Sequence, residues 1–301
     1  MNANPQARIG IALAAYQPNV EFLKAQLESL IAQTHSNWIC HITCDSPVKP
    51  IGPFDQRIRW NFNPERLGHA RNFERALSLC AADPEVVAIA FCDQDDIWLP
   101  TKLASSLQIL ATKPPLSLVH CDLAPFIGEP PAPDSALASL WKLERRGHEE
   151  HSPLEQMIRC TVNGTAALFD GELARKYPKF PVTVRHHDQW MAVLAAAHGG
   201  IHPVHEILVL YRQHGANVSG INPYRGFLEM PSSPLARIRE RNRELEDIVR
   251  AANQIGIDIT RLNRRYLLKL ALNRWTSDPV LARASLAKWV GSFPKIEGVK
   301  R

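Results

Sequence analysis

Residues 85–96 read EVVAIAFCDQDD, and this stretch decides the fold class. The run Glu85–Phe91 is almost wholly apolar, which is typical of a buried β-strand. Three carboxylates follow it directly, at Asp93, Asp95 and Asp96. In open α/β sheets, ligands bind outside the carboxyl ends of the strands. The stretch therefore predicts a buried strand that carries an acidic turn to a ligand site.

The acidic turn predicts a site for a divalent cation. Three carboxylates within four residues repel one another unless a cation compensates their charge. Hard oxygen ligands suit Mg²⁺ or Mn²⁺, which is usually held by a few carboxylates together with substrate phosphates. The alternative is an acidic turn that caps the next helix, because Asp95 and Asp96 lie near its expected start. The turn by itself leaves both interpretations open.

On both sides of this stretch, strands and helices alternate. The apolar pattern predicts further strands at 8–16, 38–43, 57–62 and 116–121, and helices at 21–32, 70–82 and 99–111. Strands separated by helices of this length indicate crossover units and a mostly parallel sheet. The pattern therefore predicts an α/β fold.

The second half of the chain is less regular. Residues 125–133 are rich in proline, and the stretch as far as residue 150 has no clean period, which predicts an insertion or loop. Beyond it we expect a helix at 154–159, a strand at 165–169, a helix that begins near His187, and a strand at 207–212. Residues after Pro234 read as helices. The whole pattern predicts one doubly wound domain over residues 1–230 and a helical extension over residues 231–301.

The charge of the chain is unevenly distributed. Of 35 Lys and Arg and 30 Asp and Glu, residues 234–301 hold 15 and 7, a net charge of +8, which leaves 20 and 23 for residues 1–233, a net charge of −3. The basic extension predicts contact with an anionic membrane surface or a phosphate-bearing acceptor. The alternative is a solvated helical face. The basic residues are not interleaved with a nucleic-acid-binding module, so we expect no nucleic-acid partner.

The sequence predicts a cytoplasmic protein. Its longest apolar runs fall far short of the roughly 20 residues that span a bilayer, and the N-terminal residues do not resemble a signal peptide. The six cysteines form no CxxC pair and most lie in apolar stretches, which indicates buried thiols in a reducing compartment.

Five segments, in this order, resemble the family 2 glycosyltransferases of the GT-A fold, and especially their bacterial rhamnosyltransferase-like branch. They are IGIALAAYQPNVEFLKAQLESLIAQTHSNW, NPERLGHARNFERAL, AFCDQDDIWLPTKL, NGTAALF and HHDQWMAVLAAAHGGIHPVHEILVLYRQHGANVSG. Together they span about two thirds of the chain. The resemblance implies a GT-A domain that binds a nucleotide-sugar donor with a divalent metal and transfers the sugar to an acceptor with inversion.

The resemblance also implies a role for individual residues. Those matched to the nucleotide donor are Ala15, Tyr16, Asp45, Arg71, Asp93, Asp95 and Arg212. Asp93 and Asp95 match the DxD pair that contacts the metal and the diphosphate, and Asp96 is placed to share that work. His214, in YRQHG, matches a late histidine that often reaches the metal. Asp188, in HHDQW, matches the carboxylate that serves as catalytic base.

The chemistry of Asp188 agrees with that role. An inverting transferase needs a base that deprotonates the acceptor hydroxyl on the face opposite the leaving group, and a carboxylate at a helix start beside His186 and His187 suits this. The alternative is an ordinary negative charge at a helix N-terminus. The chain departs from the family pattern after the second strand, where Asp45 stands without a second carboxylate and without glycine.

Two other functions use nucleotides or sugars and predict different sequence features. A sugar nucleotidyltransferase would have a loop rich in glycine and basic residues after the first strand, whereas AAYQPNVE has neither. A non-catalytic nucleotide- or sugar-binding module would be expected to lack the acidic turn or the base. The resemblance to rhamnosyltransferases implies a deoxythymidine diphosphate rhamnose donor and a lipid-linked or surface-glycan acceptor.

Overall fold

The computed structural model describes residues 6–132, 134–144, 152–215, 234–259, 262, 264–273 and 285. Its first half alternates as the apolar pattern predicts. The elements are β1 (Arg8–Ala15), α1 (Val20–Ile31), β2 (Trp38–Cys44), β3 (Ile58–Phe62), α2 (His69–Ala81), β4 (Val86–Cys92), β5 (Ile97–Trp98), α3 (Lys102–Leu110) and β6 (Leu118–Phe126). The predicted strands and helices of this half are therefore present, within a few residues of their expected ends.

The second half contains shorter elements before its last long strand. They are α4 (Leu140–Glu144), α5 (Pro153–Ile158), a 3₁₀ turn at Gly164–Ala166, β7 (Ala167–Asp170), α6 (Gly171–Lys176), α7 (His187–Ala197), β8 (Ile201–Arg212), α8 (Pro234–Gln254) and α9 (Arg264–Asn273). None of the helices in the described part of the chain is long and apolar enough to cross a bilayer.

Within the described residues, eight strands form one sheet in the order β3-β2-β1-β4-β7-β6-β8-β5. The β3-β2-β1-β4 half is parallel throughout. Strand β7 runs antiparallel to both β4 and β6, and β5 runs antiparallel to β8, while β6 and β8 are parallel. The fold is the mixed, mainly parallel α/β sheet of the GT-A class that the sequence predicts.

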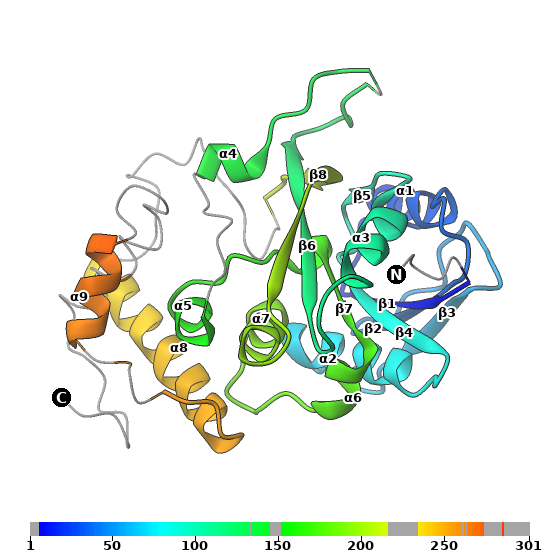
Figure 1. The fold of residues 1–301 in the computed structure, drawn as a ribbon. Coiled ribbons are helices and arrows are strands. Elements are labelled where there is room, and N and C mark those ends of the chain that lie inside the picture. The colour runs from blue at the N-terminus through cyan, green and yellow to red at the C-terminus, as the bar shows by residue number, and fades with distance from the viewer. Residues whose placement is uncertain are drawn as a thin grey trace.

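Helices cover both faces of this sheet (Figure 1). Because successive strand residues point to opposite faces, β1 and β4 contribute to two separate cores. Helices α1 and α3 pack with Ile9, Ile11 and Leu13 on one face. Helices α2, α6 and α7 pack with Ile89 and Phe91 on the other face.

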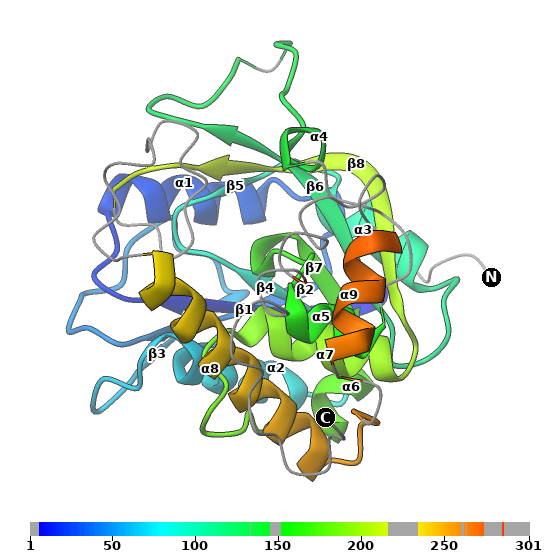
Figure 2. The same cartoon turned by 90° about the vertical axis from the view of Figure 1, so that its left-hand side faces the viewer.

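Helices α8 and α9 lie beyond α5 and α7, on the side turned toward the viewer in Figure 2. Apolar residues of α8 and α9, such as Leu245, Val249 and Leu267, belong to the same buried cluster as α5 and α7. The helical character predicted after Pro234 is thus present in these two helices. The domain boundary at residue 231 stays a prediction, since residues 216–233 lie outside the described part of the chain.

Three predicted boundaries were wrong. Strand β8 begins at Ile201, six residues earlier than predicted, because Ile201–Val204 pair with Leu118–Cys121 of β6. Helix α3 begins at Lys102, three residues later than predicted, because Ile97 and Trp98 pair with β8 as a short strand and the Leu99 amide donates to the Leu208 carbonyl at 2.9 Å. Strand β6 continues through Pro125, which the proline pattern placed in a loop.

The position of Pro125 has a physical reason. Strand β6 pairs with β7 only as far as His120, and from there to Phe126 it pairs with β8 alone. Pro125 therefore lies where one edge of the strand carries no partner strand, and proline is tolerated at such an edge because it has no amide hydrogen to leave unpaired.

Candidate active site

A cleft of about 540 Å³ opens at the carboxyl ends of β1 and β4. The sheet runs outward from β1 to β2 and β3 on one side, and resumes with β4 on the other. Strands β1 and β4 therefore flank the switch point at which open α/β sheets bind their ligands. The first residues of α2 and α7 also line the cleft, and they lie against each other, with 5.1 Å between the ring centres of His69 and His187.

The acidic turn after β4 contributes two of its three carboxylates to the cleft. Asp93 and Asp95 line it, whereas Asp96 is fully buried and accepts the backbone N–H of Arg212 at 3.0 Å. Burial, followed by the neighbouring Asp95 and Asp188 carboxylates, raises the pKa of Asp93 to about 8. Burial, followed by Asp95 and Asp93, also raises the pKa of Asp96. The carboxyl groups of the turn are thus buried and crowded so closely that ionisation of all three is unfavourable without a compensating cation.

Residues at and just after the end of β8 contact the acidic turn. His214 lines the cleft, and its Nε2 lies 2.7 Å from Oδ2 of Asp95. The Arg212 side chain donates to the Asp95 carbonyl and to the Gly128 carbonyl, each at 2.9 Å, and its guanidinium lies 4.2 Å from the centre of the Phe22 ring. Arg212 is buried and does not line the cleft, so it holds the turn in place from the protein side.

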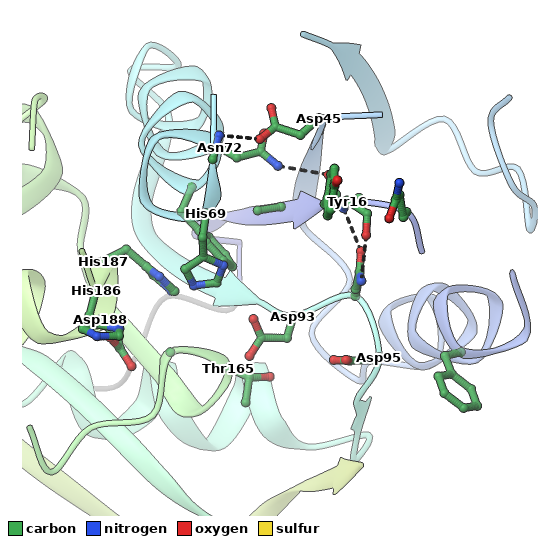
Figure 3. Close-up of a pocket in the computed structure, with 18 of the residues that line it drawn as sticks. Tyr16, Asp45, His69, Asn72, Asp93, Asp95, Thr165, His186, His187 and Asp188 are labelled. Atoms are coloured by element: carbon green, nitrogen blue, oxygen red, sulfur yellow. Dashed lines mark hydrogen bonds between the residues drawn. The ribbon is translucent and has the colours of Figure 1, made fainter. Parts of the chain in front are cut away.

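The segment after β1 forms the other end of the cleft. Ala15 and Tyr16 both line it, and the guanidinium of Arg66 lies 4.2 Å above the Tyr16 ring. The Tyr16 side chain is partly exposed. Figure 3 shows Asp93 between this end, marked by Tyr16, and the opposite end, marked by Asp188.

Asp45, at the end of β2, also lines the cleft but is already hydrogen-bonded. Its carboxylate accepts the backbone N–H of Leu67 at 3.1 Å and that of Gly68 at 2.7 Å, and the side-chain amide of Asn63. Gly68 precedes the first residue of α2 and has a positive φ of 83°. Asp45 therefore holds the backbone that leads into α2.

Arg71 lies on α2 but does not line the cleft. Its guanidinium donates to the Glu74 carboxylate and, at 2.6 Å, to the Phe180 carbonyl. Among the described residues that line the cleft, Arg66 is the one Arg or Lys side chain. A cleft with several carboxylates and so little fixed positive charge favours a ligand that arrives with a cation.

The first turn of α7 places Asp188 in the cleft. Asp188 is half-buried, and its Oδ1 accepts the backbone N–H of Gln189 at 2.8 Å. The Gln189 side chain donates to the carbonyls of Gln156 and Met157 on α5, at 3.0 and 3.2 Å. Gln189 thus anchors the start of α7 to α5.

His187 packs beneath this turn. Its ring is stacked on Phe73 with 3.7 Å between ring centres, meets Phe91 edge-on at 4.6 Å, and is almost fully buried. Burial, followed by His69 and His186, lowers its pKa well below the usual value, so the imidazole is neutral. A Cβ at Gly164 would lie 2.7 Å from Nε2 of His187. The glycine of the NGT segment therefore allows close approach of His187, next to Asp188.

Several cleft residues were not predicted from the sequence: Arg66, His69, Asn72, Gln94 and Thr165. Three of them lie in the segment NPERLGHARN, whose period predicts only a helix. Asn72 is buried and donates to the Ala15 carbonyl at 3.1 Å. One sequence signal could have indicated these residues. Several polar side chains lie within one turn of a predicted helix start, and that helix start lies at the carboxyl ends of the predicted strands.

The described residues contain no group of three or more His, Cys, Asp and Glu side chains arranged as a complete metal site. The donors present are the Asp93 and Asp95 carboxylates and the His214 imidazole that touches Asp95. Two carboxylates suit a Mg²⁺ or Mn²⁺ ion whose remaining ligands come from phosphate oxygens and water. The residues present thus fit an ion that is shared with a phosphate-bearing ligand.

Comparison with known proteins gives a family match and a fold match. The sequence model described as glycosyl transferase family 2 matches residues 11–167. The crystal structure of S. aureus TarS 1–349 in complex with UDP-GlcNAc is 11% identical, with a TM-score of 0.50 over 94% of this chain and 88% of that chain. A second structure of S. aureus TarS 1–349 is 12% identical, with a TM-score of 0.50 over 97% and 95% of the two chains. At such identity the likeness concerns the fold alone. No curated protein matches the sequence.

Proposed function

Because the chain belongs to glycosyl transferase family 2, and is therefore a glycosyltransferase, we propose that it transfers a sugar, with inversion, from a nucleoside diphosphate donor to an acceptor hydroxyl. One observation carries the proposal. Asp93 and Asp95, after β4, and Asp188, on α7, come from separate segments and face one cleft at the switch point of the sheet. A donor diphosphate and an acceptor hydroxyl can meet between these carboxylates.

In this proposal Asp188 is the general base. Inversion requires the acceptor oxygen to attack the anomeric carbon from the face opposite the departing diphosphate, so the base must lie across the cleft from the diphosphate site. Asp188 lies at the far side of Asp93 from Tyr16 (Figure 3). Its Oδ1 accepts only a local N–H among the hydrogen bonds described, which leaves Oδ2 for the acceptor proton. It lies in the first turn of α7, where the backbone N–H groups of the helix N-terminus favour negative charge.

We also propose that Asp93 and Asp95 hold a divalent cation, with His214 beside Asp95. When bound, Mg²⁺ or Mn²⁺ neutralises the negative charge that grows on the departing diphosphate. The raised pKa of Asp93 supports the proposal, because burial, together with the nearby Asp95 and Asp188 carboxylates, makes its ionisation unfavourable until a positive charge compensates. Arg212 contributes by fixing the backbone of the turn that carries Asp95.

The donor and the acceptor are narrower proposals. The resemblance to rhamnosyltransferases favours deoxythymidine diphosphate rhamnose, while the complex of S. aureus TarS with UDP-GlcNAc makes uridine nucleotides the other class to test. The acceptor we propose is a lipid-linked or growing surface glycan, reached from the cytoplasmic face of the membrane. The base Asp188 sets no limit on acceptor identity, which depends on the residues around the mouth of the cleft.

A thermal-shift screen tests the proposal. The protein is heated with UDP, dTDP and their sugars, with and without Mg²⁺ or Mn²⁺. A ligand at 100 times its dissociation constant stabilises the folded state by about 2.7 kcal/mol, which is readily measured. We expect stabilisation that needs both the metal and one class of nucleotide. An absence of stabilisation by every nucleotide in the presence of metal would contradict the proposal.

A further inference from the structure

Gln94 separates Asp93 from Asp95 in the acidic turn, but its side chain binds the segment after β1. Its Oε1 accepts the backbone N–H of Tyr16 at 2.9 Å, and its Nε2 donates to the Tyr16 carbonyl at 3.3 Å. Both bonds are drawn as dashed lines at Tyr16 in Figure 3. One side-chain amide therefore satisfies both backbone groups of a residue 78 positions away.

These bonds cross an opening in the sheet. The ladder between β1 and β4 ends at the pair Leu13 and Cys92, whereas β1 stays paired with β2 as far as Ala15 and Cys44. Beyond Leu13 the two strands no longer pair, and this separation is the switch point at which the cleft lies. The amide of Gln94 continues the β1–β4 connection past the end of the ladder, in the manner of one more backbone pair.

We propose that Gln94 is a positioning residue that sets the distance between the two ends of the nucleotide site. The inference rests on the proposed function, in which Asp93 and Asp95 hold the diphosphate through a cation. It adds that Tyr16, which lines the other end of the cleft and which the resemblance matches to the donor, contacts the nucleoside. Gln94 lies between the two carboxylates in sequence and is bonded to Tyr16 in space. The two halves of the donor site therefore keep one spacing as long as both bonds are made.

This role has a distinctive consequence for binding. A whole nucleotide must reach both ends of the cleft, so it binds well only when their spacing is correct. A nucleoside contacts one end and pyrophosphate contacts the other, so neither depends on the spacing. Loss of the Gln94 bridge should thus weaken binding of the nucleoside diphosphate and leave its two fragments nearly unaffected.

The experiment compares wild type with two variants. Gln94→Asn shortens the side chain by one methylene, so the amide no longer reaches Tyr16, and Gln94→Met keeps the length but removes both hydrogen bonds. Dissociation constants are measured by calorimetry or ligand-observed NMR for UDP and dTDP with Mg²⁺, for uridine and thymidine, and for pyrophosphate with Mg²⁺. We expect both variants to bind the preferred nucleoside diphosphate about tenfold more weakly, as the loss of two hydrogen bonds implies, and each fragment within about twofold of wild type.

Gln33 offers a matched control. Its side-chain amide forms the same kind of bridge, accepting from the Leu103 N–H at 3.0 Å and donating to the Leu99 carbonyl at 2.9 Å, and it does not line the cleft. Gln33→Asn should lower the melting temperature and leave nucleotide binding unchanged.

The outcomes separate this inference from the proposed function. If wild type binds neither UDP nor dTDP with Mg²⁺, the proposed function fails and the role of Gln94 fails with it. If wild type binds one of them but the Gln94 variants bind it equally well, the role of Gln94 alone is overturned. Equal weakening of the nucleotide and of both fragments would also overturn it, because that result indicates general damage to the cleft.

Discussion

At the scale of single residues, Asp188 and Asp95 give opposite predictions. Asp188→Asn keeps the shape of the side chain but removes the base, so the acceptor proton has no place to go. We expect the turnover number to fall by 10²-fold or more, since general base catalysis commonly contributes 10²–10⁴-fold. Affinity for the metal–nucleotide donor should stay close to wild type, as measured by calorimetry beside a steady-state transfer assay.

Asp95→Asn is the matched contrast within the same cleft. It removes one of the two carboxylates proposed to hold the cation, the one that His214 contacts. Donor binding in the presence of Mg²⁺ should weaken, whereas binding of the nucleoside alone should not. Substantial activity in both variants would contradict the roles assigned to these two carboxylates.

A residue-scale prediction also follows for stability against pH. His187 is neutral and buried in the folded chain, with Phe73, Phe91, His69, His186 and Asp188 around it or beside it in the same turn. Its pKa is lowered on folding, so below the ordinary value of 6.5 the unfolded chain binds a proton that the folded chain does not. The stability contribution of neutral His187 is therefore present above about pH 6.5 and is lost as the pH falls below it.

Denaturant unfolding between pH 7.5 and 5.0 checks this. The slope attributable to one such group is at most about 1.4 kcal/mol per pH unit. The other histidines titrate in the same range, so the informative quantity is the difference between wild type and His187→Gln, whose slope should be shallower. Identical slopes in the two proteins would show that His187 does not stay neutral on folding.

The residue scale is also where the sequence predicts least. The resemblance matched Asp93, Asp95, Asp188 and His214 to positions that all line one cleft. It matched Arg71 to the donor side as well, but that side chain is bonded to Glu74 and to a carbonyl more than 100 residues away. A motif predicts which residue type stands at a position. It does not predict the direction of a long side chain, because the hydrogen-bond partner that sets this direction can lie far away in the sequence.

At the scale of elements, the existence of the longer strands was predictable because each contains a run of apolar residues. The short strand β5 was not, since two residues carry no period and their pairing depends on β8, which lies more than 100 residues later. Pro125 in β6 could not be placed either, because proline excludes a paired strand edge but not an unpaired one. Local pattern thus fixes the existence of elements, and tertiary pairing fixes their limits.

The contact between the 3₁₀ turn at Gly164–Ala166 and helix α7 gives an element-scale prediction. In Gly164→Ala the new Cβ would lie 2.7 Å from Nε2 of His187, which is buried and cannot yield without moving the first turn of α7. We expect a loss of about 1–3 kcal/mol of stability and a fall of tenfold or more in the turnover number, because Asp188 moves with that turn. The KM for the donor should change little.

Gly171→Ala is the control for this contact. Its Cβ would lie 2.8 Å from the Val86 carbonyl, so it is similarly tight, but Gly171 does not line the cleft. It should lower the melting temperature and leave the turnover number unchanged. A turnover number that falls equally in both variants would mean that general loosening, and not displacement of α7, explains the effect.

At the scale of the whole molecule, the mixed sheet brings the residues of the proposed site to one end of its strands. Strands β1 and β4 run parallel and bring Tyr16 and Asp93 to the same end. Strand β7 is antiparallel to β4, so its first residue lies at that end, with Gly164 just before it in the chain. The parallel half was predictable from alternating helices and strands. The antiparallel insertion of β7 was not, because a four-residue strand gives no signal of its direction.

The uneven charge gives the last prediction, which concerns membrane contact by residues 231–301. Their net positive charge favours an anionic bilayer by about 1 kcal/mol for each Lys or Arg near the surface. We expect the protein to sediment with phosphatidylglycerol vesicles at about 10 mM salt, where charges act over roughly 30 Å, and to be released near 1 M, where they act over about 3 Å. Replacement of Lys288, Lys295 and Lys300 by Gln should reduce binding, whereas the same change at Lys49, Lys113 and Lys142 should not. Absence of binding at low salt, or equal loss of binding in both triple variants, would contradict membrane contact by residues 231–301. The alternative, a solvated helical face, would then hold, and the chain itself would not bring the enzyme to a membrane-bound acceptor.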